Sequence, residues 1–230
     1  MEHPYLFLTK LAEMFGVSPE TAMDYKHVFY SWFVMALILS FGFIATRGIK
    51  LVPGKGQNVL ELMVGGIEDF MVTVTGEEGR WLLPVTATIF IYILICNLTG
   101  LLPGFFPPTA SINTTASCAI VVFCLTHIIG VKYHGVKYIK HFTGPVAALI
   151  PLFLILEIIG HLARVLSLSF RLFGNMMGHE LVLTILFMLA GAFFAPLPIM
   201  ALGVFVSLVQ AFVFFLLSTM YFAGAMEHAH

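Results

Sequence analysis

The sequence predicts an all-α polytopic membrane protein with five membrane-embedded helices and one amphipathic interfacial helix. Of its 230 residues, 60% are apolar, the mean hydropathy is +0.99 and only 10% carry a charge, against about 25% in a soluble domain. The stretches 28–46, 81–131 and 181–226 contain no Lys, Arg, Asp or Glu. Because a membrane span needs roughly 20 apolar residues, each of the two longer stretches has room for two helices.

The whole chain is expected to be a single membrane domain, and its first third contains one span. Residues 1–27 are interpreted as a short leader, and 28–46 as the first span. Basic residues with proline and glycine then end that helix. Apolar residues alternate with acids over 53–80, which is typical of an amphipathic helix at the membrane interface.

The remaining spans follow in two pairs. A helical hairpin is expected at 81–102 and 116–131, joined by the uncharged, proline-containing turn 103–115. Two long helices are expected at 145–190 and 199–225, separated by the sequence APLP. No internal repeat is visible.

The distribution of basic residues predicts the orientation. Short cytoplasmic loops are enriched in Lys and Arg. Seven of the eleven basic residues fall in two segments on the same side of this topology, namely Arg47, Lys50, Lys55, Arg80, Lys132, Lys137 and Lys140. The N-terminus is therefore expected outside and the C-terminus in the cytoplasm.

Composition and motifs exclude several functions. A net charge of −1 shows no nucleic-acid footprint. The three cysteines lack zinc-like spacing, and two histidines near the C-terminus, His228 and His230, are too few to predict a metal site. No phosphate loop or nucleophile motif is present. We expect no cofactor, no bound metal and no catalytic chemistry in this chain.

A stripe of polar side chains runs along the helix expected at 145–190. At about 100° per residue, its members fall within a sector of roughly 80°. They are Glu157, His161, Arg164, Arg171, Asn175 and His179. The stripe rises by about 33 Å, close to the hydrocarbon thickness of a bilayer. Ionisable groups inside a membrane are costly and usually mark a pathway; the alternative is that they only join helices.

Arg171 differs from the rest of this polar stripe. Its guanidinium keeps its proton at any working pH, so it cannot relay protons, but it attracts a carboxylate. Glu180 is nine residues away and Glu157 fourteen. The partner carboxylate is therefore expected on another polypeptide. The side chains of Glu157, His161, His179 and Glu180 can titrate, which suits water-filled access routes.

The last expected helix carries two polar groups one turn apart, Ser207 and Gln210. If this helix folds back on the preceding one, Gln210 is expected to reach Arg171 or Glu180. For Ser207, simple hydrogen bonding between helices is as good an interpretation as a functional role.

The sequence SLSFRLFGNMMGHE, residues 167–180, resembles the signature of subunit a of F-type ATP synthases. Its motif R-L-x-G-N-x-x-x-x-E is matched by Arg171, Leu172, Gly174, Asn175 and Glu180. ICNLTGLLPG (95–104) is similar to the family's N-L-x-G-L-x-P turn, and LVQAFVF (208–214) to its last-helix motif with Gln210. The resemblance covers most of the chain from about residue 81.

The resemblance implies a non-catalytic stator subunit in the bacterial plasma membrane. Its partners would be a ring of c subunits, the peripheral-stalk b subunits and the lipid bilayer. The two long helices would be tilted and curve along the ring, and Arg171 would face the ring carboxylate between two offset half-channels. Glu180, His179, Asn175 and Gln210 would serve the outer half-channel, and Glu157, His161 and Ser167 the cytoplasmic one. The transported ion would be H⁺, which the histidines and glutamates favour over Na⁺.

This chain departs from the family pattern at two places. Some members carry Gly before the motif's Glu and His in the last helix, where this chain has His179 and Gly203. Our hypothesis is that the swap keeps one imidazole in the same channel. The family often has an acid in the outer turn near the position of Ser111.

A secondary transporter or ion channel, and an intramembrane enzyme, are the alternative functions. A secondary transporter or ion channel could use Arg171 to bind an anionic substrate, but such proteins more often show paired repeats and broken helices. An intramembrane enzyme would need a nucleophile–base pair or a metal motif. The stator hypothesis is the one that predicts a ring and a stalk as partners.

Overall fold

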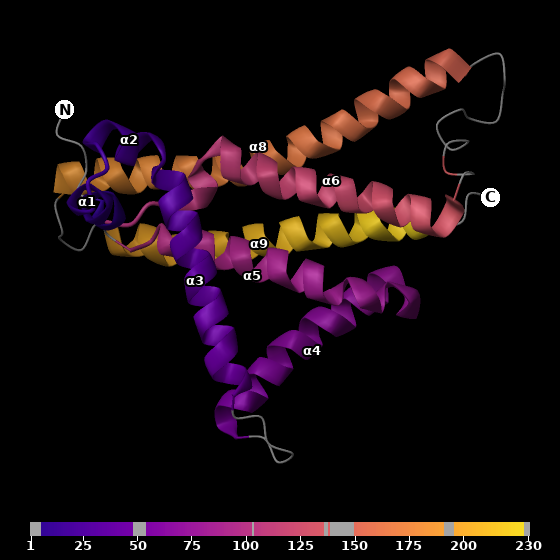
Figure 1. Cartoon of the computed structure of the whole chain (residues 1–230), viewed down its shortest axis with the longest axis horizontal. Helices are drawn as coiled ribbons and strands as arrows, with labels where there is room; N and C mark the ends of the chain where they lie inside the picture. The colour runs from indigo at the N-terminus through magenta and orange to yellow at the C-terminus, as the bar shows by residue number, and fades with distance from the viewer. Residues whose placement is uncertain are drawn as a thin grey trace.

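The structure is a computed structural model that describes residues 6–47, 54–102, 104–135, 138, 150–190 and 196–227. These residues form helices and turns without strands, which confirms the all-α prediction for the described part of the chain. The elements, labelled in Figure 1, are α1 (Phe7–Met14), α2 (Pro19–Asp24), α3 (Lys26–Thr46), α4 (Lys55–Thr75), η1 (Glu77–Leu82), α5 (Leu83–Thr99), η2 (Pro108–Ala110), α6 (Ile112–His134), α8 (Ile150–Ala190) and α9 (Pro196–Met226).

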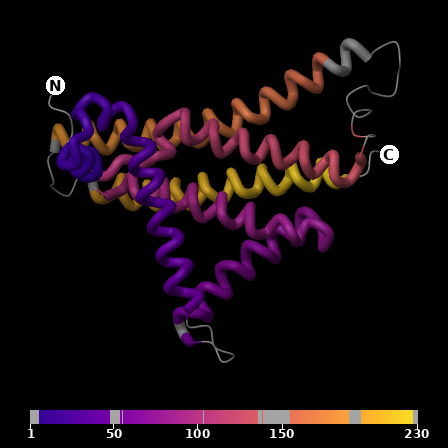
Figure 2. Tube along the Cα trace, viewed as in Figure 1, coloured from indigo at the N-terminus to yellow at the C-terminus, as the bar shows by residue number. Residues whose placement is uncertain are grey.

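Within the described ranges, five helical segments are long and apolar enough to cross a membrane, as predicted. They are α3, η1 with α5, α6, α8 and α9. Figures 1 and 2 show α5, α6, α8 and α9 running lengthwise beside one another. Helix α3 leads away from them and α4 leads back, so that the two form a V whose point lies away from the bundle. Helices α1 and α2 lie at one end of this bundle, and α9 ends at the other, beside the end of α6.

Several helix ends differ from the predicted ranges. Helix α6 begins at Ile112, four residues before the predicted 116, and in its first turn Thr115 Oγ1 donates to the carbonyl of Ile112 over 3.2 Å. Helix α9 begins at Pro196, where proline is well tolerated in a first turn. Predictions for Lys50, Lys137, Lys140, residues 145–149 and the two terminal histidines lie outside the described residues.

The described part of the leader folds as two short helices, and Tyr30 is one of the residues that join them to the bundle. The side chain of Ser18 caps α2 by accepting from Thr21 N over 3.3 Å. The fully buried Tyr30 of α3 donates its hydroxyl to the carbonyl of Gly104 over 3.1 Å and accepts from Leu8 N over 3.2 Å. One side chain thus joins α1, α3 and the turn after α5.

A buried asparagine joins three further elements. Asn97 of α5 donates from Nδ2 to the carbonyl of Ser207 over 3.4 Å and accepts from Thr109 Oγ1 over 2.7 Å. All three side chains are buried. An unsatisfied amide in this environment would cost about 1–3 kcal/mol, so these bonds favour one arrangement of α5, η2 and α9. This is the structural role of the NLTGLLPG sequence.

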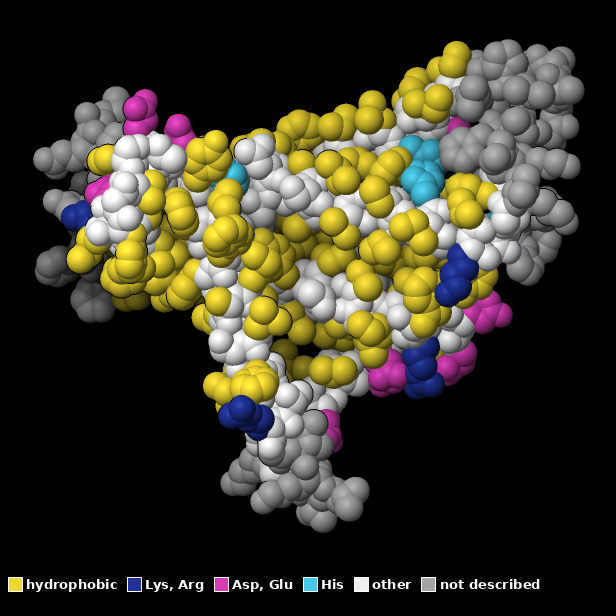
Figure 3. Space-filling model, in the orientation of Figure 1, with side chains coloured by type: hydrophobic (Ala, Val, Ile, Leu, Met, Phe, Trp, Pro, Cys, Tyr) yellow, Lys and Arg dark blue, Asp and Glu magenta, His cyan; other side chains and the backbone are white. Residues whose placement is uncertain are grey.

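The face of the bundle seen in Figure 3 is largely apolar, and the charges visible on the lengthwise bundle gather toward its ends. At the end of α6, the Lys132 ammonium lies 3.6 Å from the centroid of the Trp81 ring. Beside it, Arg80 of η1 pairs with Glu68 of α4 at 2.6 Å and with Glu77 of its own element at 3.2 Å. Tryptophan and lysine at such a position are typical of a membrane–water interface.

Candidate functional site

All but one of the predicted site residues lie on α8, a continuous helix of 41 residues. A helix of this length rises about 60 Å, which is twice the hydrocarbon thickness, so α8 must be tilted or extend beyond the bilayer. Along it the predicted residues differ in exposure: Arg171, Asn175 and Ser167 are exposed, Glu157, His179 and Glu180 are partly buried, and His161 is buried.

Arg171 projects from the exposed side of α8. Among the residues that the structure describes, no carboxylate lies within 4.0 Å of its guanidinium, and no hydrogen bond reaches it. The next residue, Leu172, about 100° round the helix, is fully buried and packs into the core. Among the described residues Arg171 thus has no acidic partner, and the expectation that its carboxylate partner lies on another polypeptide stays a prediction.

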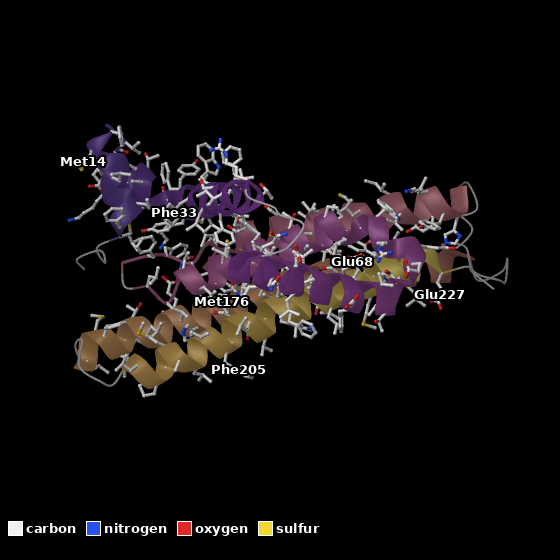
Figure 4. The ribbon with its side chains drawn as sticks, turned by 90° about the horizontal axis from the view of Figure 1, so that it is seen from below. Met14, Phe33, Glu68, Met176, Phe205 and Glu227 are labelled. Atoms are coloured by element: carbon white, nitrogen blue, oxygen red, sulfur yellow. The ribbon has the colours of Figure 1, made fainter. Side chains whose placement is uncertain are left out.

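Asn175, one turn beyond Arg171, joins α8 to α9. Its Nδ2 donates a hydrogen bond of 2.6 Å to Oε1 of the buried Gln210. The sequence predicts a contact of Gln210 with Arg171 or Glu180 instead. Figure 4 shows α8 and α9 side by side near the labelled Met176 and Phe205. The register of this antiparallel pair decides which residue of α8 Gln210 meets.

His179 occupies the space that the absence of a side chain at Gly203 leaves open. A Cβ at Gly203 would collide with Nε2 and Cε1 of the His179 ring and with Leu101. In the described part of the chain, Nε2 is buried without a hydrogen-bond partner. The structure thus brings together His179 and Gly203, the two positions of the hypothetical exchange.

A larger cavity, of about 480 Å³, opens beside Glu180. Since about 10–15 Å³ on this scale holds one water, it has room for many. Glu180 and Met177 of α8 line it together with residues of the α2–α3 junction and the start of α6, namely Asp24, Lys26, His27, Ser111 and Asn113. Asp24 and His27 are not among the site residues that the sequence predicts, because only the folded leader brings them to the cavity beside Glu180. The one sequence signal for this region is that the family often has an acid near the position of Ser111, where this chain has none.

A smaller cavity, of about 20 Å³, lies toward the other end of α8. It has room for one water, and His161, Arg164 and Tyr221 are among its lining residues. His161 Nε2 lies 3.2 Å from Glu157 Oε1, which is an ion-pair distance when the ring is protonated. The Arg164 guanidinium lies 5.6 Å from the centroid of the Tyr221 ring.

The predicted residues therefore fall into two sets. Glu180, His179, Asn175 and Gln210 gather on one side of Arg171, and Glu157 with His161 on the other. Ser167 lies on exposed α8 surface between them and lines neither cavity. No group of three or more metal-binding side chains occurs among the described residues. The titratable groups thus lie in two sets along α8, with the permanently charged Arg171 between them.

Comparison with known proteins identifies relatives along the whole chain. The family model described as ATP synthase A chain matches residues 28–223. A protein of Desulfosudis oleivorans named ATP synthase subunit a is 68% identical over 230 residues, and one of Syntrophobacter fumaroxidans with the same name is 56% identical over 239. A third, from Geotalea daltonii, is 52% identical over 233 residues. All of this chain and all of each relative are covered.

Proposed function

The chain belongs to the ATP synthase subunit a family, and from this premise we propose that it provides two proton half-channels and an arginine that faces the c-ring. The observation that carries the proposal is the exposed Arg171, which has no acidic partner in the described part of the chain. An arginine at the membrane centre costs about 2.5–3.5 kcal/mol on insertion scales. A carboxylate on a neighbouring subunit offsets this cost.

The outer half-channel leads through the larger cavity to Glu180. Its volume, which has room for water, and its titratable lining groups, Asp24 and His27 among them, support proton exchange with the outer solution. From Glu180 the route continues past His179, and past the bonded pair of Asn175 and Gln210, toward Arg171. A proton arriving there neutralises a ring carboxylate and lets it leave the arginine for the lipid.

The inner half-channel runs from the other side of Arg171 toward the cytoplasm through His161 and Glu157. Ser167 lies between these groups and the arginine and offers a hydroxyl to the same route. After a nearly complete turn of the ring, a carboxyl group releases its proton here. Arg171 favours the ionised carboxylate that remains and separates the two routes, so protons pass only with rotation.

The orientation of the chain follows from the charges at its ends. Arg80 and Lys132 lie at one end of the bundle, joined through Trp81. We place this end, and with it the C-terminus, in the cytoplasm of a bacterial cell and the N-terminus outside. The peripheral-stalk b subunits and the c-ring are the expected partners, and the proton is the transported ion.

The decisive experiment replaces Arg171 by alanine in the assembled ATP synthase. We expect the variant complex to retain its c-ring and stalk subunits after purification, and to lose both proton-driven ATP synthesis and ATP-driven proton pumping in vesicles. Arg47→Ala, which removes an exposed arginine at the far end of α3, is the matched control and should pump normally. Coupled synthesis at the normal rate in Arg171→Ala would overturn the proposal.

A further inference from the structure

A second histidine lies beside His161 at the inner end of the bundle. His127 of α6 is half-buried, and its ring centroid is 4.8 Å from that of His161, with the rings inclined by 62°. The sequence motifs singled out neither His127 nor its neighbour Tyr138. Figure 3 shows histidine side chains gathered on this face, over α6 and α8.

Tyr138 and Phe123 fix the position of the His127 ring. The Tyr138 hydroxyl and His127 Nδ1 are 2.8 Å apart, and Phe123 packs edge-on against His127 with centroids 4.3 Å apart. The Tyr138 ring itself lies directly on Gly130, where a Cβ would collide with it. The contact with Tyr138 suits both charge states: the hydroxyl donates to a bare Nδ1 and accepts from a protonated one.

These contacts make a continuous series of titratable groups across two helices. Glu157 lies 3.2 Å from His161, His161 stacks edge-on against His127, and His127 contacts Tyr138. Arg164 and Tyr221, from α8 and α9, line the cavity on which His161 borders. Imidazoles exchange protons near neutral pH, and a single bridging water is enough for proton transfer between groups at such a separation.

We propose that His127 and His161 form a proton relay in the inner half-channel, with Tyr138 as the residue that positions His127. The inference rests on the proposed function. One imidazole accepts a proton released on the Arg171 side and becomes an imidazolium. It returns to neutral by passing this proton to its neighbour, to Glu157 or to cytoplasmic water, so one proton enters and one leaves. Because like charges repel at this distance and Arg164 adds a permanent charge, the pair holds one proton at a time.

The experiment measures ATP-driven proton pumping by the intact ATP synthase in inverted vesicles, whose outer solution is the cytoplasmic side. We expect His127→Gln to lower the rate about fivefold and to flatten its dependence on outer pH between roughly 6 and 7.5. This loss is smaller than the roughly 10²–10⁴-fold of an essential proton-transfer group, because Glu157 remains. His134→Gln, on the same helix but bonded to the carbonyl of Ala225 instead, is the matched control.

Restoring activity with added imidazole distinguishes a proton-relay role of His127 from a role in packing. Added imidazole should restore pumping in His127→Ala and leave His134→Ala unchanged, and Tyr138→Phe should shift the pH profile without abolishing pumping. If His127→Ala fails to assemble, the pH profile of His127→Gln decides. A normal rate and pH profile in His127→Gln, with Arg171→Ala inactive, would overturn the relay alone. Normal pumping in Arg171→Ala would overturn the proposed function as well.

Discussion

The imidazole of His179 rests directly on Gly203, so that α8 and α9 meet at a histidine and a glycine. The two residues lie 24 positions apart in the sequence, on two different helices. Together they are one contact. The space that a side chain at Gly203 would fill is occupied by a ring from the other helix, which is the contact that the exchange hypothesis predicts.

The first prediction tests this exchange. His179→Gly should reduce proton-driven ATP synthesis, and the double change His179→Gly with Gly203→His should recover part of it because the imidazole returns from the other helix. ATP synthesis in vesicles is the measurement. Equal losses in the single and double variants would reject the exchange. Gly42→Ala, at a helical glycine with nothing within 4 Å of its Cβ position, is the control for a harmless glycine change.

A second prediction concerns the chemistry of the central cation. Arg171→Lys should lower coupled pumping on the order of tenfold or more, because a lysine ammonium lacks the planar fork and can lose its proton when buried. Arg164→Lys keeps a cation beside Tyr221 and should have a much smaller effect. Pumping rates of the two variants in the same vesicles make the comparison. Similar rates would show that any positive charge on α8 suffices.

The third prediction maps water in the larger cavity by thiol labelling. The three native cysteines, Cys96, Cys118 and Cys124, are first replaced by serine. Met177→Cys lines the cavity and should react with a membrane-impermeant maleimide added from outside, because only a hydrated thiol ionises to the reactive thiolate. Ile185→Cys lies on the same helix, is exposed in the isolated chain and does not line the cavity, so it should stay unlabelled. Equal labelling at both positions would contradict a cavity confined to one side of α8.

A fourth prediction concerns stability. Asn97→Leu should destabilise the chain by about 1–3 kcal/mol, because it leaves the buried Thr109 hydroxyl and the carbonyl of Ser207 without their partner. The midpoint of thermal unfolding in detergent is the measurement. Asn113→Leu, at an exposed position in the first turn of α6, should lower the midpoint far less. A midpoint unchanged by Asn97→Leu would show that this amide does not hold α5, η2 and α9 together.

Much of the fold could be predicted because hydrocarbon imposes simple rules. A segment that crosses a bilayer must satisfy its own backbone hydrogen bonds, so long uncharged stretches become helices. This argument predicts α3, α5, α6, α8 and α9, and it works least well at their ends. At the start of α6, a polar sequence that looks like a turn is already helical, and its side chains bond within the helix, as Thr115 does.

The sequence alone determined the order of the polar residues along α8 and the distance of Arg171 from every acid on that helix. Helical geometry converts spacing in the sequence directly into position. The contacts between elements were decided by tertiary structure: Gln210 with Asn175, His179 with Gly203, His127 with His161, and Asp24 beside the cavity of Glu180. Each depends on the register and rotation of two packed helices. Side-chain packing sets these quantities, and no periodicity within a single helix contains them.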